Sequence, residues 1–250
     1  MAIKKAYLTI DDSPSAHMRP KIDFLLHKGI PAIFFCEGRK IDERPEAVIY
    51  AIQNGFIIGN HSYNHPQFSA ISLAEAFEEI QRTDALIDTI YQQANVTRPA
   101  KYFRFPYGDK GGLVGEYPTS GYGEEGTKRK NIIQDHLRQL GYQQPAFTNI
   151  TTTYYREAGL LDEADWFWTF DTFDWSVNSA EPMYGITSLE AVYARIDEDE
   201  PEGARGLNRP ESEEIVLIHD HDDSTDIFYP IVERLQEKGL QFSLPAELAG

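Results

Sequence analysis

Apolar runs alternate with amphipathic segments along the chain. Short apolar or β-branched runs that predict strands occupy residues 7–10, 31–36, 56–59, 101–105, 166–170, 215–218 and 240–244. Apolar residues at helical spacing predict helices within residues 18–26, 45–53, 72–91, 133–140, 187–196 and 231–235. This alternation is typical of an α/β fold with a largely parallel sheet. Because no repeat or linker interrupts it, residues 1–250 are expected to form one domain.

Two helix starts carry a capping-box pattern, and one long segment lacks any pattern. Ser72 precedes Glu75 by three residues, and Thr187 precedes Glu190 in the same way. Residues 108–126 are rich in glycine and show no periodicity, which predicts a loop of unusual length for a compact domain.

Polar residues stand directly after the apolar runs at five places. They are Asp11, His61, Arg104, Asp171 and His219. An α/β barrel builds its active site from residues at the carboxyl ends of successive parallel strands. Single polar residues of this kind could be helix caps, but five at corresponding positions favour a barrel with a site at one end.

The first of these places holds two carboxylates, Asp11 and Asp12, followed by Pro14, which stops the strand. Two adjacent like charges are costly to bury unless a cation or a shared proton accompanies them. Because neighbouring side chains in a strand point to opposite faces, the two aspartates are expected to diverge and serve different roles. A turn that caps the next helix is the alternative interpretation.

His61 and His65 are four residues apart, a spacing at which one turn or helix presents both rings on one face. Two imidazoles and one carboxylate can chelate a divalent transition metal, and Asp12 supplies the carboxylate. Such a triad leaves open positions for water and substrate, as catalysis requires. Surface or capping histidines are the alternative.

Arg104 lies between two aromatic residues at a strand end, where it is expected to orient Asp11 and to be held in turn by Asp171. A surface arginine stacked on an aromatic ring is the alternative. His219 follows a fully apolar run and suits a general acid near neutral pH, although His221 could take that role instead. Three further acids here are interpreted as a solvated turn: Asp220, Asp222 and Asp223.

Composition narrows the functional classes. The 250 residues carry a formal net charge of −17, which argues against nucleic acid and anionic membranes as partners. The single cysteine, Cys36, lies in an apolar run and is expected to be a core residue. No apolar segment is long enough to cross a membrane and no secretory signal is visible, so a cytoplasmic protein is expected, with a trimmed exported form as the alternative. The oligomeric state is not predicted.

The chain resembles the metal-dependent polysaccharide deacetylases, the NodB-homology domain, nearly from end to end. Five segments carry the resemblance, in the family's order: Thr9-Ile10-Asp11-Asp12-Ser13-Pro14, His61-Ser62-Tyr63-Asn64-His65, Arg104-Phe105-Pro106-Tyr107, Asp171-Thr172-Phe173-Asp174-Trp175 and Leu217-Ile218-His219-Asp220. Two departures stand out, namely Ser13 where the family has glycine and the long insertion after Tyr107.

The resemblance implies a distorted (β/α) barrel of the polysaccharide deacetylase type, with roles for individual residues. Asp11 would be the catalytic base and His219 the acid, while Arg104 and Asp171 would tether the base. The remaining implied roles are metal ligands at Asp12, His61 and His65, an oxyanion contact from the Tyr107 main-chain N–H, and an acetyl pocket lined by Trp175 and Leu217. The implied metal is zinc, with cobalt, nickel or manganese as alternatives.

The function that follows is metal-dependent removal of N-acetyl groups from an amino-sugar glycan resembling chitin or peptidoglycan. Asp11 would take the proton of the attacking water, and His219 would protonate the departing amine. Two enzymatic alternatives use the same site, namely O-deacetylation of xylan and hydrolysis of a small amide or cyclic imide. A glycan-binding relative without activity is the alternative from another class.

Overall fold

A parallel sheet of short, buried strands organises the computed structural model, which describes residues 4–147, 149–201, 205–209 and 211–245. The strands are β1 (Lys4–Ser13), β2 (Ala32–Cys36), β3 (Ile57–Asn60), β4 (Phe170–Asp171), β5 (Glu214–His219) and β6 (Leu240–Phe242). Their order is β3-β2-β1-β5-β4, with β6 beside the start of β1, and every pairing is parallel. The α/β class expected from the alternating pattern is confirmed.

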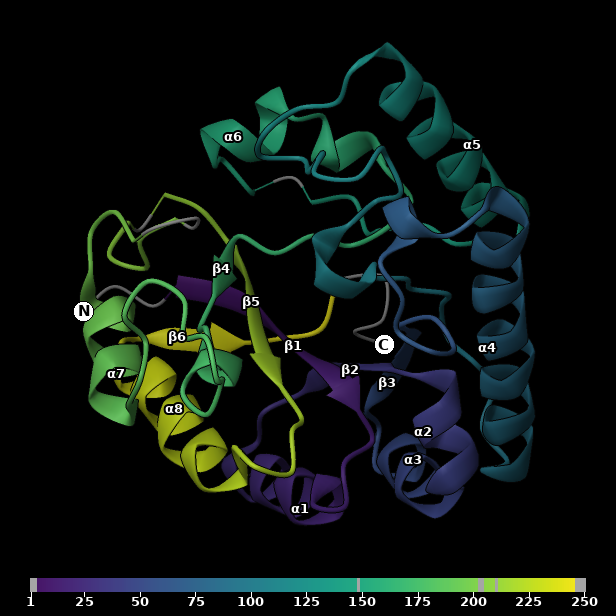
Figure 1. The fold of residues 1–250 in the computed structure, drawn as a ribbon. Coiled ribbons are helices and arrows are strands. Elements are labelled where there is room, and N and C mark those ends of the chain that lie inside the picture. Colours follow the sequence, from purple (N-terminus) through teal and green to yellow (C-terminus); the bar gives the residue numbers. More distant parts are fainter. Residues whose placement is uncertain (1–3, 148, 202–204, 210, 246–250) are drawn as a thin grey trace.

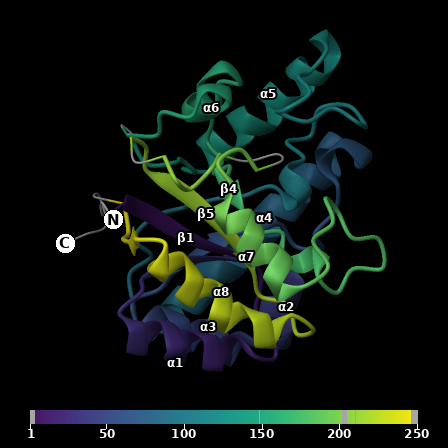
Figure 2. The same ribbon diagram turned by 90° about the vertical axis from the view of Figure 1, so that its left-hand side faces the viewer.

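Helices connect successive strands and cover the sheet. They are α1 (Met18–Lys28), α2 (Gly38–Glu43), α3 (Pro45–Gln53), α4 (Leu73–Gln93), α5 (Glu124–Gln139), α6 (Thr153–Glu157), α7 (Leu189–Asp197) and α8 (Thr225–Glu237). Short 3₁₀ turns are η1 (Phe68–Ala70), η2 (Pro106–Gly108), η3 (Leu160–Asp162) and η4 (Asp174–Ser176). In Figures 1 and 2, α1, α7 and α8 lie on one side of the sheet, and α5 and α6 lie on the opposite side.

Side chains of β1 alternate between two apolar layers. Leu8 and Ile10 belong to the large core between the sheet and the outer helices. Tyr7 belongs to a second, aromatic cluster with Phe35 and Trp166. Because successive side chains of a strand point to opposite faces, Thr9 and Asp11 share the inner face with Tyr7. The inner layer therefore leads along β1 directly to the first carboxylate.

Two expected strands are mostly absent, and this gap makes the barrel distorted. Residues 101–105 form only an isolated bridge between Phe103 and Asn60. The strand expected at 166–170 is reduced to the two-residue β4, which shares only Phe170 with that range. In this part of the barrel, neighbouring segments are joined by single hydrogen bonds instead of by strand pairing. In one of them, the Trp166 main-chain N–H donates to Phe103 O at 2.8 Å. Trp166 and Phe103 are fully buried, so these segments are held in place by side-chain packing more than by strand pairing.

Helix positions follow many of the sequence signals, with several corrections. At α4, Ser72 Oγ accepts from the Glu75 N–H at 3.2 Å and Glu75 Oε2 accepts from the Ser72 N–H at 2.8 Å, so the capping box is confirmed. At α7 the cap is Ser188, not Thr187, because the Ser188 side chain accepts from the Ala191 N–H. Two short helices, α2 of six residues and α6 of five, were not revealed by periodicity.

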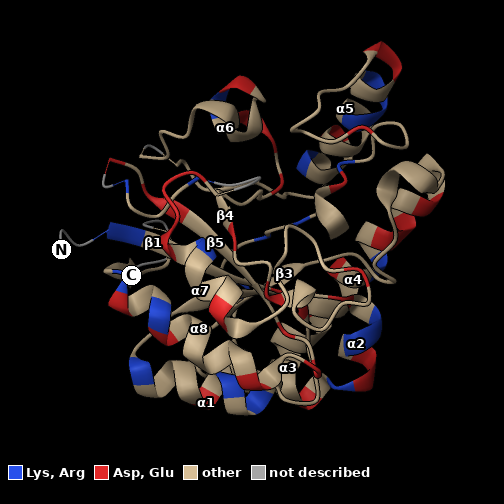
Figure 3. Ribbon diagram, turned by 60° about the vertical axis from the view of Figure 1, so that its left-hand side comes forward, with Lys and Arg blue, Asp and Glu red and all other residues tan. Residues whose placement is uncertain are grey.

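The surface carries both signs of charge despite the formal net charge of −17. Figure 3 shows Lys and Arg positions interspersed with Asp and Glu positions along the outer helices. Cys36 is fully buried, and this burial raises the pKa of its thiol well above the ordinary value. Cys36 is thus the core residue expected from its apolar run. Within the described ranges, no helix combines the length and the apolar character that a membrane span needs.

Candidate active site

Asp11 and Asp12 lie at the end of β1, where the backbone departs from regular strand geometry. The pairing of β1 with β2 shifts register between Ile10 and Ser13, and Asp12 has a φ of 61°. This irregularity turns the Asp12 side chain away from the direction a regular strand would give it. Asp11 Oδ2 and Asp12 Oδ1 consequently lie 3.7 and 3.3 Å from the same atom, His61 Nε2. The expected divergence of the two carboxylates is therefore wrong.

The two histidines occupy the turn after β3 rather than a helix. Their ring centroids are 4.9 Å apart. Ser62 and His65 have φ values of 66° and 58°, and the His65 N–H donates to Ser62 Oγ at 3.1 Å. Glu79 of α4 fastens the turn by accepting from the Tyr63 N–H at 2.8 Å. The turn thus presents both rings toward the end of β1.

Three atoms of this cluster fit a divalent metal. His61 Nδ1 lies 2.8 Å from the Arg104 carbonyl oxygen, which can only accept, so Nδ1 carries the hydrogen and Nε2 presents its lone pair. His65 Nε2 lies 3.0 Å from Asp12 Oδ1, and the three candidate ligand atoms lie within 4.8 Å of one another. Among the described residues, Asp12 Oδ1 is a buried oxygen without a hydrogen-bond partner. Two imidazole nitrogens facing a carboxylate oxygen that has no hydrogen-bond partner suit a cation.

The Asp12 carboxylate is also held in its charged form. Burial alone would raise its pKa, but contacts with His221, His61 and His65 bring the pKa well below its usual range. A carboxylate must be ionised to bind a metal, and this environment meets that condition.

Backbone strain concentrates around the same atoms. Five non-glycine residues near the site have positive φ, between 55° and 66°: Asp12, Ser62, His65, Tyr107 and Phe173. Each such residue costs on the order of 1–3 kcal/mol and persists only where its surroundings hold it. Strain of this kind commonly gathers at functional sites.

Arg104 is buried beside Asp11. Its Nη1 donates to Asp11 Oδ1 at 2.9 Å and to Thr9 Oγ1 at 2.7 Å, and its Nε donates to Trp166 O at 3.2 Å. The guanidinium also lies over the Phe35 ring, 4.4 Å from the centroid. The alternative of a surface arginine is wrong, because Arg104 is 1% exposed.

Asp171 does not hold Arg104. Within the described part of the chain, the Asp171 carboxylate accepts from the Phe173 N–H at 2.8 Å, and no hydrogen bond or ion pair joins it to Arg104. The reason is the strand order, since Asp171 in β4 pairs with Leu217 of β5 and lies on that side of the site. Burial raises the pKa of Asp171 to about 6.

Sequence reasoning overlooked Asp174 as the partner of His219. Asp174 Oδ1 lies 2.9 Å from His219 Nδ1, and Asp174 Oδ2 accepts from the His219 main-chain N–H at 3.0 Å. Although burial alone would lower it, the Asp174 carboxylate raises the pKa of His219 to about 10. This contact assigns the hydrogen-bonded proton to Nδ1 and leaves Nε2 for the site. The signal was present, because Asp174 stands in the same acidic segment as Asp171.

Base and acid candidates lie side by side. Asp11 in β1 and His219 in β5 are register partners, and the Asp220 N–H donates to Asp11 O at 2.9 Å. Neighbouring strands are about 5 Å apart, so the two side chains emerge at one level of the barrel.

The acidic turn after His219 is only partly solvated. Asp220 is fully buried and accepts from Lys21 Nζ at 2.6 Å, from Ser15 Oγ at 2.6 Å and from the Ser15 N–H at 2.8 Å. It joins the ends of β1 and β5, so its assignment to a solvated turn is wrong. Asp222 and Asp223 are exposed, as expected.

The residues expected to contact substrate differ in exposure. Tyr107 is 57% exposed, and its ring centroid lies 4.5 Å from that of His65. Trp175 is partly buried, and Leu217 lies on the inner face of β5, opposite Thr9. The insertion after Tyr107 is a loop only to Gly123, because α5 begins at Glu124.

The chain is similar to several known proteins. Residues 1–117 match the family model described as polysaccharide deacetylase. A peptidoglycan-N-acetylglucosamine deacetylase from Bacillus cereus is 26% identical over 96% of this chain and 68% of its own length. Chitin deacetylase 1 from Cryptococcus neoformans is 26% identical over 85% of this chain, which spans 36% of that relative.

Solved structures share the fold. A polysaccharide deacetylase from Bacillus cereus superposes with a TM-score of 0.61 and 24% identity, over 96% of this chain and 91% of the other. A pseudoenzyme of carbohydrate esterase family 4 from Bacillus anthracis superposes with a TM-score of 0.61 and 19% identity, over 99% of this chain and 66% of the other. The distorted barrel is confirmed by both.

Proposed function

The chain belongs to the polysaccharide deacetylase family, and we propose that it removes N-acetyl groups from an amino-sugar glycan. The observation that carries the proposal is that the three candidate metal ligands meet Asp11 and His219 at one end of the barrel. Relatives named for peptidoglycan and chitin suggest a glycan built of N-acetylglucosamine units.

Zinc is the metal we propose, held by Asp12, His61 and His65. Two imidazole nitrogens and one carboxylate oxygen form a donor set that zinc, cobalt, nickel and manganese accept. When bound, such a metal supplies Lewis acidity for the acetyl carbonyl and lowers the pKa of a water.

The chain's own residues would carry the proton transfers. Asp11, hydrogen-bonded to Arg104, takes a proton from the attacking water. The main-chain N–H of Tyr107, a residue whose ring packs against that of His65, would donate to the oxyanion of the tetrahedral intermediate. His219 then protonates the departing amine, and Asp174 keeps its imidazole charged at neutral pH because the pKa of His219 is raised to about 10. An amine leaving group needs this proton far more than an alcohol does, which favours N-deacetylation.

Acetate release from a panel of substrates tests the proposal. The panel holds chitin oligomers, peptidoglycan, acetylxylan and a small acetamide, each assayed with and without added zinc, and a cyclic imide is assayed for ring opening. We expect metal-dependent acetate release from the amino-sugar glycans. Hydrolysis of acetylxylan alone, or of the small amide or imide alone, would contradict the proposal. Glycan binding without hydrolysis of any of them would identify a binding protein instead.

Metal content gives a second prediction. Protein purified without added metal is expected to hold about one divalent ion per chain, and the double variant Asp12→Ala, His65→Ala is expected to hold almost none, because two of the three candidate ligands are gone. Elemental analysis measures both. Asp23→Ala, which removes an exposed carboxylate of α1, is the control and should retain the wild-type content. Unchanged metal in the double variant would place the ion elsewhere.

A further inference from the structure

His221 contacts the candidate metal centre although it lies outside all five segments that carry the family resemblance. Its Nε2 lies 2.6 Å from Asp12 Oδ2. An ionised carboxylate can only accept, so Nε2 carries the hydrogen and donates it. The two oxygens of Asp12 are thereby divided, since Oδ2 faces His221 and Oδ1 faces His61 and His65.

The main chain that carries His221 is fixed from two sides. Its carbonyl oxygen accepts from Lys21 Nζ at 3.1 Å and from Thr225 Oγ1 at 3.0 Å. Lys21 is itself fully buried in an ion pair with Asp220, at 2.6 Å. The main chain at His221 is therefore held in one position, and this limits where the imidazole ring can lie.

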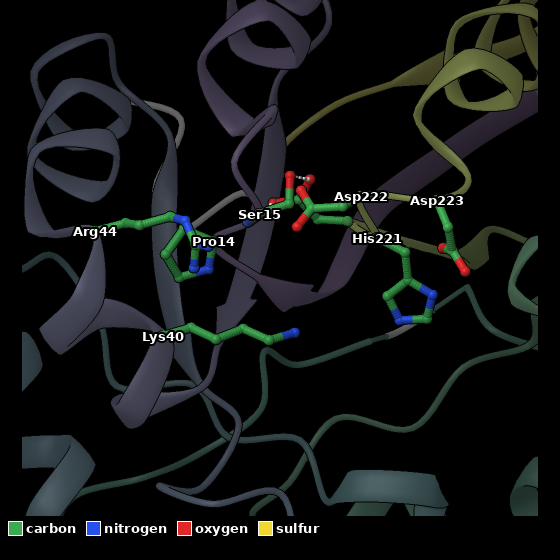
Figure 4. Close-up of a pocket in the computed structure, with 8 residues that line it drawn as sticks. Pro14, Ser15, Lys40, Arg44, His221, Asp222 and Asp223 are labelled. Carbon is green, nitrogen blue, oxygen red and sulfur yellow. Dashed lines mark hydrogen bonds between the residues drawn. The ribbon is translucent and has the colours of Figure 1, made fainter.

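Asp12 is held through its main chain as well. Lys40 Nζ donates to Asp12 O at 2.7 Å and forms an ion pair with Glu37 at 2.7 Å. Lys40 and His221 both line a pocket of about 310 Å³, and Figure 4 shows them extending into it from opposite sides. Lys40, through the main-chain oxygen, and His221, through the side chain, thus hold Asp12 in place. Asp12 has a φ of 61°, which is unfavourable for a residue with a side chain.

We propose that His221 is a positioning residue of the metal centre, which holds Asp12 Oδ2 so that Asp12 offers the metal only Oδ1, in one orientation. The inference rests on the proposed metal site. Its physical basis is preorganisation, since a ligand already held in the bound geometry loses less conformational freedom when the ion arrives. Partners that hydrogen-bond to metal ligands typically change metal affinity by about 10- to 100-fold.

Zinc titration of the metal-free protein tests this role without any activity assay. We expect His221→Ala to raise the zinc Kd, measured by competition with a chromogenic chelator, by about 10- to 100-fold. His221→Gln should stay within about threefold of wild type, because its amide N–H can reach the same carboxylate oxygen. The matched control is His27→Ala, an exposed histidine of α1, which should leave the Kd unchanged.

The outcomes separate this inference from the metal site itself. Failure of the wild-type protein to bind zinc would overturn the site, and His221 with it. Wild-type binding with an unchanged Kd in His221→Ala would overturn the positioning role alone. Thermal unfolding of the metal-free variants distinguishes affinity from folding, since a positioning role predicts unchanged unfolding temperatures. A weakened His221→Gln with normal folding would also contradict the hydrogen-bond role.

Discussion

Replacing Asp11 with Asn is expected to lower kcat/KM for glycan deacetylation by about 10²- to 10⁴-fold, the usual contribution of a general base. The substitution keeps the shape of the side chain but removes its basic oxygen. Arg104 Nη1 donates a hydrogen bond to Asp11 Oδ1 at 2.9 Å, which fixes the orientation of the side chain. The measurement is acetate release over a range of substrate concentrations.

Metal content serves as the internal control for Asp11→Asn. Asp11 stands outside the triad of candidate ligands, so the variant should retain the ion while losing turnover. A variant that keeps more than a tenth of the wild-type kcat/KM would assign the base to another group. A variant that loses both metal and turnover would make Asp11 a ligand.

Removal of the proposed acid is expected to distinguish amide from ester substrates. His219→Ala should lower kcat/KM by about 10²- to 10⁴-fold for an N-acetyl glycan and much less for an activated acetyl ester, whose leaving group needs no proton. Equal losses on both substrates would remove His219 from this role. The two kcat/KM ratios, measured with the same enzyme preparation, decide between the outcomes.

Asp174→Asn should change the pH dependence of the same step. An acid must be protonated, so kcat/KM falls as pH rises through the pKa of His219, which the Asp174 carboxylate raises to about 10. Without that carboxylate the pKa drops, and the alkaline loss of activity should begin at lower pH. Asp171→Asn is the matched control, because Asp171 makes its side-chain hydrogen bond to the Phe173 N–H and not to His219. Its alkaline limb should move less.

Patterns of local sequence predicted most of the scaffold. Apolar runs located β1, β2, β3 and β5 because these strands are buried on both faces, and glycine marked the end of α1 at Gly29, which adopts φ of 66°. The strand expected at 101–105 did not form. Its residues are apolar enough to be buried but contribute only one bridge to the sheet, and a sequence does not state which buried segments form ladders.

The candidate site was predictable only where spacing alone brings groups together. His61 and His65 share the turn after β3, and Asp12 lies at the end of β1. The contacts of His219 with Asp174 and of His221 with Asp12 link residues 45 and 209 positions apart. They depend on strand order and on a backbone irregularity at Asp12. Neither of these can be predicted from a local sequence pattern.

The strands that carry the candidate site differ in how extensively they are paired. β1 is paired with β2, β5 and β6, whereas the two-residue strand β4 pairs with β5 alone among the described residues. Segments with few buried pairings open at lower free energy than the global unfolding of a protein. Opening of β4 and the turn that carries Asp174 would separate the acid from its partner while Asp12, His61 and His65 stayed together on the β1–β3 side. Under the proposed roles, such openings would interrupt proton delivery by His219 and leave the candidate metal ligands in place.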